Sequence, residues 1–233
     1  MGNLATVLAA RFPTQSLNRY KFWGVSNASS VADGKMVGTY DKVHLVMFGE
    51  YVPFAHLIPI LNRLSSLTGS VEAGAGPVAL CIGGNCYIPS ICYETAIPHV
   101  IRHQVATLET NNEHPAALIN LTNDAWYWGS SELDMHLACG VFRAVETRLP
   151  LLIAANGGLT AWVDHVGRVR AKTPRQKPNF LLADIEPSDM QSVYVQYGDW
   201  FSGLCLACCV ILLCIGWKSN RDISKARRQG ENV

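Results

Sequence analysis

Charged residues are scarce in this chain, and neither sign predominates. They make up 16% of the 233 residues, whereas ordinary soluble domains hold about 25%. Apolar residues make up 49%, and this richness excludes an intrinsically disordered chain. The 19 basic and 18 acidic residues leave a net charge of +1. A nucleic-acid partner is therefore not expected, since such proteins carry a basic excess.

Several other signals are absent. The sequence contains no internal repeat and no low-complexity tract, which excludes solenoid and linker-like architectures. No C-x2-C pair is followed by a second pair of ligands, as a structural zinc site requires. Cys81 and Cys86 flank Ile-Gly-Gly-Asn, which is typical of a hairpin turn. A disulfide between them and two free thiols both stay open as alternatives.

A long apolar run covers residues 200–217 and contains no charge. As a helix it would span about 27 Å, close to the hydrocarbon thickness of a bilayer. Trp200 and Trp217 bound the run, and tryptophan prefers the headgroup level of a membrane. The alternative is a buried core helix, which rarely lacks all charge over such a length. The run therefore predicts one C-terminal transmembrane helix.

The residues after this run are basic. Basic residues beside a membrane span favour the cytoplasmic side, and here they are Lys218, Arg221, Lys225, Arg227 and Arg228. The C-terminus is therefore expected in the cytoplasm, with the preceding domain on the other side. A signal peptide is not expected at residues 1–10, because the stretch is short and lacks a basic start. One C-terminal span cannot readily export the domain before it, so we expect this chain to be the C-terminal part of a longer membrane protein.

Short apolar runs alternate with helical patterns along the rest of the chain. The patterns predict strands at 87–91, 116–121, 149–155 and 180–185, a hairpin of 160–163 with 168–170, and helices at 54–67, 95–106 and 132–148. Pro59 and Pro98 are expected to disturb the first two helices. Strands that alternate with helices predict an α/β fold with helices layered on a sheet.

Cys92 is the best candidate for a nucleophile. It directly follows the strand predicted at 87–91, and α/β folds bind ligands where their strands end. The thiolate is the reactive form of cysteine, and a neighbouring cation favours it. Spacing alone leaves a structural cysteine as the commoner alternative.

The sequence around Cys92 carries a series of motifs. They are YDKVHLVMFGEYVP at 40–53, ICYE at 91–94, NLTNDAW at 120–126, HL at 136–137, RAVE at 143–146 and AANGG at 154–158. In this order they resemble the nitrilase (carbon–nitrogen hydrolase) superfamily, and most closely its membrane branch, the apolipoprotein N-acyltransferases. The predicted chain begins with an unassigned segment at 1–26, which is followed by a partial carbon–nitrogen hydrolase domain at 27–195. A transmembrane helix at 200–217 and a basic cytoplasmic tail at 218–233 complete it.

The resemblance implies a nitrilase-like αββα sandwich, incomplete at its N-terminus, with a Glu–Lys–Cys catalytic set. Cys92 matches the nucleophile, and Lys42 matches the cation that stabilises the thiolate and then the oxyanion. The backbone N–H of Tyr93 is implied as a second oxyanion donor. Glu50 is implied to orient the lysine, and Glu94 to be needed for activity. Without the resemblance, Lys42 is a solvated surface lysine and Glu50 a loop carboxylate.

Other residues are assigned more loosely. By the same resemblance, Trp126 and Tyr127 line an acyl-chain entrance, although such aromatics are more often core or interface anchors. His136, like His44, is predicted to pack or hydrogen-bond rather than act as a base. The family's general-base glutamate lies upstream of the lysine, but no glutamate precedes Glu50 in this chain. The base is therefore not assigned.

The resemblance implies an acyltransferase of lipoprotein maturation in the bacterial inner membrane, with its catalytic domain on the periplasmic side. By the same resemblance, the nucleophile is expected to take a fatty acyl group from a membrane phospholipid as a thioester. It is then expected to pass the group to the N-terminal amine of a diacylglyceryl apolipoprotein. The lipid bilayer is an expected partner, and no metal or organic cofactor is expected. The alternatives are an amidase of the same superfamily and a catalytically incomplete, membrane-anchored remnant or interaction module.

Overall fold

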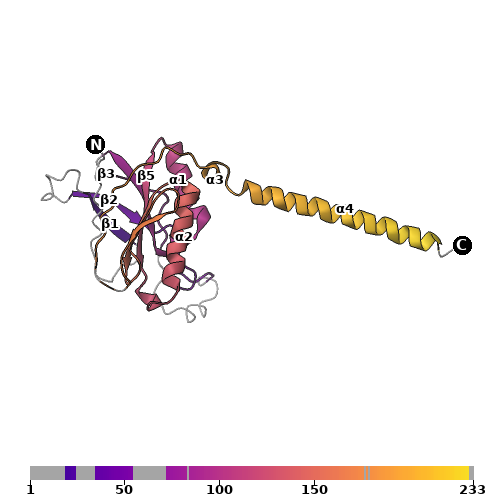
Figure 1. Cartoon of the computed structure of the whole chain (residues 1–233), viewed down its shortest axis with the longest axis horizontal. Coiled ribbons are helices and arrows are strands. Elements are labelled where there is room, and N and C mark those ends of the chain that lie inside the picture. The colour runs from indigo at the N-terminus through magenta and orange to yellow at the C-terminus, as the bar shows by residue number, and fades with distance from the viewer. Residues whose placement is uncertain are drawn as a thin grey trace. The chain divides into compact units, whose positions relative to one another are not determined.

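A computed structural model describes residues 19–24, 35–54, 72–82, 84–175, 177 and 179–230 (Figure 1). The helix expected at 54–67 lies outside these residues apart from its first position. The chain divides into two compact units, Met1–Gln196 and Tyr197–Val233. Each unit is described by itself below.

A six-stranded mixed sheet forms the centre of the first unit. Its order is β3-β4-β5-β6-β7-β8, and its strands are β3 Leu80–Ile82, β4 Asn85–Ile91, β5 Pro115–Asn123, β6 Leu151–Asn156, β7 Ala161–Val163 and β8 Val169–Lys172. The strands β4, β5 and β6 are parallel, and the outer pairs are antiparallel. The strands predicted at 87–91, 116–121 and 149–155 and the hairpin that follows are therefore confirmed. The sequences of the parallel strands are continuous apolar runs because both faces of these strands are buried.

Two helices cover one face of this sheet (Figure 1). Helix α1 (Pro98–Thr110) joins β4 to β5, and α2 (Glu132–Thr147) joins β5 to β6. Buried side chains of both helices, such as Ile101 and Leu133, pack against Ile88 and Leu118 of the sheet. The helix expected at 95–106 thus exists, but the expectation that Pro98 disturbs it is wrong. Pro98 begins the helix, where its missing N–H has no intrahelical partner to lose.

The opposite face of the sheet packs against a second, smaller sheet and an extended segment. Strands β1 (Arg19–Gly24) and β2 (Lys35–Asp41) form an antiparallel pair, and β1 falls in the segment that the sequence left unassigned. Tyr40 of β2 is fully buried in a cluster with Tyr87 and Ile119. The end of β2 is therefore anchored in the core, and this fixes the position of the chain that continues to Lys42.

The strand predicted at 180–185 is wrong. No strand pairs with this stretch among the described residues, although Ile185 is buried against the core. Phe180 and Leu182 are 78% and 71% exposed. A strand requires a neighbour that takes up its backbone hydrogen bonds, and apolar composition alone does not supply one.

Gly140 sets how closely α2 approaches β6. A Cβ atom at this position would lie 2.8 Å from Leu151 Cδ2 and 3.0 Å from Ile153 Cδ1, and both side chains are buried. We expect Gly140→Ala to lower the free energy of unfolding by about 1–3 kcal/mol through overpacking, measured by denaturant titration in detergent. Met135→Ala, at an exposed position of the same helix, is the control. Helix propensity alone favours alanine over glycine by about 1 kcal/mol, so a stabilised Gly140→Ala would contradict the prediction.

The second unit is dominated by one long helix. Helix α4 covers Trp200–Gly230, and it follows the short α3 (Val193–Tyr197) of the preceding chain. The segment Trp200–Arg221 contains an apolar window with a mean hydropathy of 2.2, and none of that window is buried. By length and composition this helix is able to cross a membrane, and it contains the apolar helix that the sequence predicts at 200–217.

Candidate active site

Cys92 lies at the carboxyl end of β4, at the first position of the 3-10 helix η2 (Cys92–Ala96). Its thiol is free and partly buried. Its φ of 52° is in the left-handed region, which costs a residue with a side chain roughly 1–2 kcal/mol. Such strain persists only where the surroundings fix the backbone, and it is concentrated at functional sites. The contacts that fix this turn therefore define the site.

Glu94 is the first of these contacts. Its carboxylate is fully buried and accepts a hydrogen bond of 2.7 Å from the N–H of Ile91. It also accepts bonds from the N–H groups of Val43 and His44, at 2.7 and 2.9 Å, and from the Tyr40 hydroxyl at 3.1 Å. A carboxylate removed from water needs such donors to remain stable. Glu94 therefore ties the cysteine turn to the chain around Lys42.

The Tyr40 hydroxyl extends this network into the core. It accepts a hydrogen bond of 2.7 Å from Gln104 Nε2 while it donates to Glu94. Burial is the main reason that the pKa of Tyr40 is raised far above its ordinary value, and the neighbouring Glu94 charge raises it further. The phenol therefore stays protonated and remains a donor to the carboxylate. Sequence analysis did not assign a role to Tyr40 or Gln104, although Tyr40 opens the first motif.

Replacing Glu94 by glutamine tests this network. The amide would keep the shape of the side chain but turn an NH2 group toward N–H donors of Val43, His44 or Ile91. We expect Glu94→Gln to lower the free energy of unfolding by about 2–4 kcal/mol, because buried donors lose a charged acceptor. Thermal or denaturant unfolding measures the change. Glu113→Gln, at a partly exposed position beyond α1, should change it by less than about 0.5 kcal/mol. Equal effects of the two variants would contradict the role given to Glu94.

Lys42 is buried, with 1% of its surface exposed. Its Nζ lies 2.8 and 2.9 Å from the two carboxylate oxygens of Glu50, and Glu50 also accepts a hydrogen bond from the Val46 N–H at 2.8 Å. A solvated surface lysine is therefore excluded, since a buried ammonium persists only with a partner. The two residues that follow Lys42 are bound to Glu94, so the ammonium and the cysteine belong to one hydrogen-bonded unit.

The backbone carbonyl of Cys92 is held by two side chains from other elements. Asn120 of β5 donates from Nδ2 at 3.2 Å, and His136 of α2 lies with Nε2 at 3.3 Å. The other ring nitrogen of His136 lies 3.2 Å from Asp124 Oδ1. The prediction that His136 forms hydrogen bonds is confirmed. Asn120 and Asp124 were not singled out in the sequence, although both belong to the motif at 120–126.

Asp124 is packed closely at the same edge of the sheet. It is buried and accepts a hydrogen bond of 2.6 Å from the Thr122 hydroxyl. A Cβ atom on Gly158 would lie 2.5 Å from Asp124 Oδ2. A side chain at position 158 would clash with the Asp124 carboxylate. This clash explains why the motif at 154–158 ends in glycine.

Three aromatic side chains are exposed in the short 3-10 helices η2 and η3 (Ala125–Tyr127), which follow β4 and β5. Tyr93, Trp126 and Tyr127 are 48%, 68% and 37% exposed, so Trp126 is not a core anchor. Partial burial is the main cause that raises the pKa of Tyr127, and negative charge on Cys92 raises it next. Tyr127 is therefore close enough to Cys92 for the two groups to interact electrostatically.

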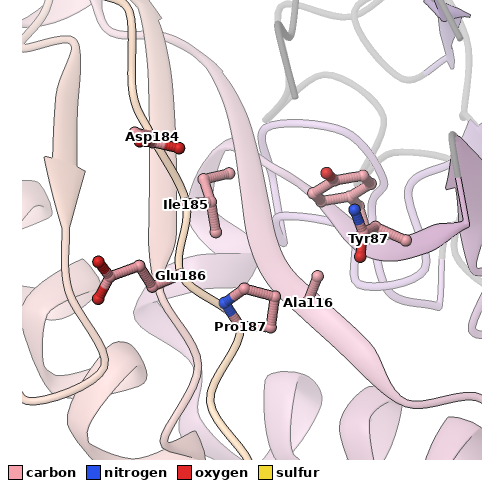
Figure 2. Close-up of a pocket in the computed structure, with 7 residues that line it drawn as sticks. Tyr87, Ala116, Asp184, Ile185, Glu186 and Pro187 are labelled. Carbon is pink, nitrogen blue, oxygen red and sulfur yellow. The ribbon is translucent and has the colours of Figure 1, made fainter. Parts of the chain in front are cut away.

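A cavity of about 410 Å³ lies at the other end of β4. Its described lining comes from β4, β5 and the segment before α3, and it consists of Asn85, Tyr87, Ala116, Asp184, Ile185, Glu186 and Pro187. In Figure 2 the Glu186 carboxylate points away from Ala116. A strand rises about 3.3 Å per residue, so this cavity is well separated from Cys92 and does not belong to the site.

In the part of the chain that the structure describes, no group of three or more His, Cys, Asp or Glu side chains is arranged to hold a metal ion.

The family whose model matches this chain is the carbon–nitrogen hydrolases. The chain belongs to this family: the carbon-nitrogen hydrolase model matches residues 23–194. The expected α/β nitrilase-like fold with one C-terminal apolar helix is therefore confirmed.

The curated relatives narrow the comparison. The chain is 36% identical over 185 residues to apolipoprotein N-acyltransferase of Geobacter metallireducens, covering 79% of this chain and 34% of that protein. It is 35% identical over 175 residues to the protein of the same name from Rhodopirellula baltica, covering 74% and 31%. The recognised similarity to this membrane branch is thus confirmed. The chain spans about one third of the length of these relatives.

Solved structures resemble the chain more distantly. A carbon–nitrogen hydrolase superfamily protein from Xanthomonas campestris aligns with a TM-score of 0.49 and 18% identity, covering 72% of this chain and 56% of that one. An amidase from Nesterenkonia aligns with a TM-score of 0.47 and 19% identity, covering 73% and 58%.

Proposed function

We propose that this chain carries the acyl-transfer site of an apolipoprotein N-acyltransferase, with Cys92 as the nucleophile. One observation carries the proposal: a free cysteine at a strained strand end is tied through Glu94 to the buried Lys42–Glu50 pair. A buried ammonium near a thiol favours the thiolate and later the oxyanion. The named relatives supply the reaction class.

In the first half-reaction the Cys92 sulfur attacks the ester carbonyl of a membrane phospholipid. The C–S bond forms, and the carbonyl electrons move onto oxygen, where Lys42 and the Tyr93 N–H stabilise the charge. When the intermediate collapses, the ester C–O bond breaks, and the leaving oxygen takes the proton that the thiol lost. The products are a thioester on Cys92 and a lysophospholipid.

In the second half-reaction the N-terminal amine of a diacylglyceryl apolipoprotein attacks the thioester carbon. A C–N bond forms, the C–S bond breaks, and the proton released by the amine returns to the sulfur. Dividing the transfer into two steps in this way predicts ping-pong kinetics. Glu50 keeps the ammonium in place through both steps, and Glu94 is a positioning residue because it contacts the backbone rather than the reacting atoms.

The location that we propose is the outer side of the bacterial inner membrane. Cys81 and Cys86 form a disulfide across the β3–β4 hairpin, and disulfides persist mainly outside the cytoplasm. Helix α4 then crosses the bilayer, and the basic residues at 218–233 stay in the cytoplasm. In this arrangement the hydrolase domain at 27–195 works at the membrane surface, where both lipid substrates are concentrated. The exposed Trp126 and Tyr127 border the acyl-chain entrance.

The proposal is tested with the full-length protein in vesicles of phosphatidylethanolamine and a synthetic diacylglyceryl lipopeptide. We expect the lipopeptide to gain one acyl group on its N-terminal amine, measured by mass spectrometry. A lipopeptide with an acetylated amine is the control and should gain nothing. Hydrolysis of a small soluble amide without lipopeptide acylation would instead establish the amidase alternative. Inactivity toward both would favour a catalytically incomplete remnant.

A further inference from the structure

We propose that Asn120 and His136 are positioning residues for the oxyanion site, acting through the peptide group between Cys92 and Tyr93. The inference rests on the proposed function, because it assumes that a carbonyl carbon is attacked by Cys92. The two residues are proposed to orient the backbone N–H of Tyr93, and not the sulfur or the lysine.

The contacts converge on one carbonyl oxygen. Asn120 Nδ2 lies 3.2 Å from the oxygen of Cys92, and His136 Nε2 lies 3.3 Å from it. The two side chains come from a strand and a helix, 28 and 44 residues along the chain from Cys92, and Asn120 also donates to Ser90 Oγ of β4 at 3.1 Å. Both side chains are more than nine-tenths buried. The carbonyl is therefore held from rigid elements rather than from a loop.

Holding this carbonyl determines the direction of the next N–H. A trans peptide group is planar, so its C=O and N–H point in opposite directions, and no described peptide bond is cis. Tyr93 is the second residue of η2, and the first N–H groups of a helix have no acceptor within it. Donors on the carbonyl also polarise the peptide group and strengthen its N–H as a donor. The Tyr93 N–H is thereby fixed as a backbone donor beside the sulfur.

The strained backbone explains why such support is required. The φ of 52° at Cys92 is a conformation that relaxes unless its surroundings hold it. A relaxation at this residue would rotate the following peptide group, and the N–H would turn away from the oxyanion. The two side-chain donors oppose that rotation.

The two ring nitrogens of His136 have different partners, which makes the proposal testable at one position. Nε2 faces the Cys92 carbonyl oxygen, whereas Nδ1 faces the Asp124 carboxylate. Both neighbours are hydrogen-bond acceptors, so the proposal takes Nε2 as a protonated nitrogen that donates to the carbonyl. The amide nitrogen of a glutamine lies about where Nε2 was, and that of an asparagine about where Nδ1 was. His136→Gln therefore keeps the donor to the carbonyl, and His136→Asn keeps only the donor to Asp124.

The experiment uses the full-length protein and measures two reactions of Cys92. The first is acylation by p-nitrophenyl butyrate and by a phosphatidylethanolamine with a fluorescent acyl chain, which passes through an oxyanion. The second is alkylation by iodoacetamide, which forms no oxyanion, with the modified Cys92 peptide quantified by mass spectrometry. Losing one oxyanion donor slows catalysis by about 10²–10³-fold, and a misaligned donor should cost somewhat less.

We expect His136→Asn to slow acylation by about 10–100-fold, and His136→Gln by no more than about threefold. Alkylation should stay within about threefold of wild type in both variants. Asn120→Ser, which withdraws the other donor, should reproduce the pattern of His136→Asn and serves if that variant does not fold. Equal acylation by the two His136 variants, or a parallel loss of alkylation, would overturn the proposal.

The outcome separates this inference from the proposed function. Wild-type protein that is acylated by p-nitrophenyl butyrate but not by the phospholipid contradicts the lipid substrate, and the His136 comparison still decides the role of the carbonyl contacts. Wild-type protein that is acylated at Cys92 by neither compound overturns both.

Discussion

Replacing Cys92 by alanine is expected to abolish the acyl-enzyme. The sulfur is the atom to which the acyl group is bound in the proposed reaction, so its loss removes the intermediate rather than slowing its formation. The full-length variant is incubated with a phosphatidylethanolamine that carries a fluorescent acyl chain, and labelled protein is counted after denaturing electrophoresis. The expected signal is background, whereas wild type is labelled.

Cys139 provides the matched control for this prediction. It is also a free and partly buried cysteine, but it lies on α2. Cys139→Ala should be labelled as strongly as wild type. Neutral hydroxylamine should release the label from both, because it cleaves thioesters. A label that survives Cys92→Ala would show that another residue carries the acyl group and would end the assignment.

Replacing Lys42 by methionine is expected to slow acyl-enzyme formation by about 10²–10³-fold, the effect of removing one oxyanion donor. Methionine has a similar length but no charge, so it also leaves the Glu50 carboxylate without its ammonium partner. A partly buried carboxylate without its partner lowers stability as well. The rate of label incorporation and the unfolding midpoint are therefore measured together.

Lys172→Met, at an exposed position of β8, is the control and should leave both quantities unchanged. The double variant in which Lys42→Met is combined with Glu50→Gln also removes the carboxylate charge that faced the Lys42 ammonium. It should recover stability without recovering the rate of labelling. A double variant that regains the wild-type rate would show that Lys42 supports folding and not the reaction.

These two predictions share one structural basis, the network around Glu94. The carboxylate joins the turn after β4 to the chain around Lys42, and the Tyr40 hydroxyl links it to Gln104 in α1. Both oxygens of the Glu94 carboxylate are thereby hydrogen-bonded in the core. In the proposed reaction the sulfur and the ammonium are positioned by groups that do not react.

Much of the fold was predictable because its elements bury apolar runs of simple period. The runs at 87–91 and 116–121 became β4 and β5, and the helical spacing at 132–148 became α2. The same rule failed at 180–185, where an apolar stretch has no strand beside it among the described residues. The expectation that Pro98 disturbs its helix was also wrong. A proline breaks a helix when it lies in the middle, but it is favoured at the first turn, where Pro98 lies.

The candidate site was also predictable only in part. Its predicted residues followed from motif resemblance, and Cys92 also followed from its place after a buried strand. The partners Tyr40, Gln104, Asn120 and Asp124 did not, because each is an ordinary polar residue until the fold brings it to a carboxylate or a carbonyl. The pairing of Cys81 with Cys86 likewise stayed open until the hairpin set the two residues opposite each other.

The sequence by itself determined the class of fold and the apolar helix, and it predicted Cys92 as the candidate nucleophile. Each of these depends on local composition, on period or on a motif that is contiguous in the chain. Only the tertiary structure decided that Lys42 is buried, that Glu94 accepts hydrogen bonds from backbone N–H groups, and that His136 reaches the Cys92 carbonyl. Those facts depend on which residues distant in sequence meet at one edge of a sheet, and no local pattern encodes that meeting.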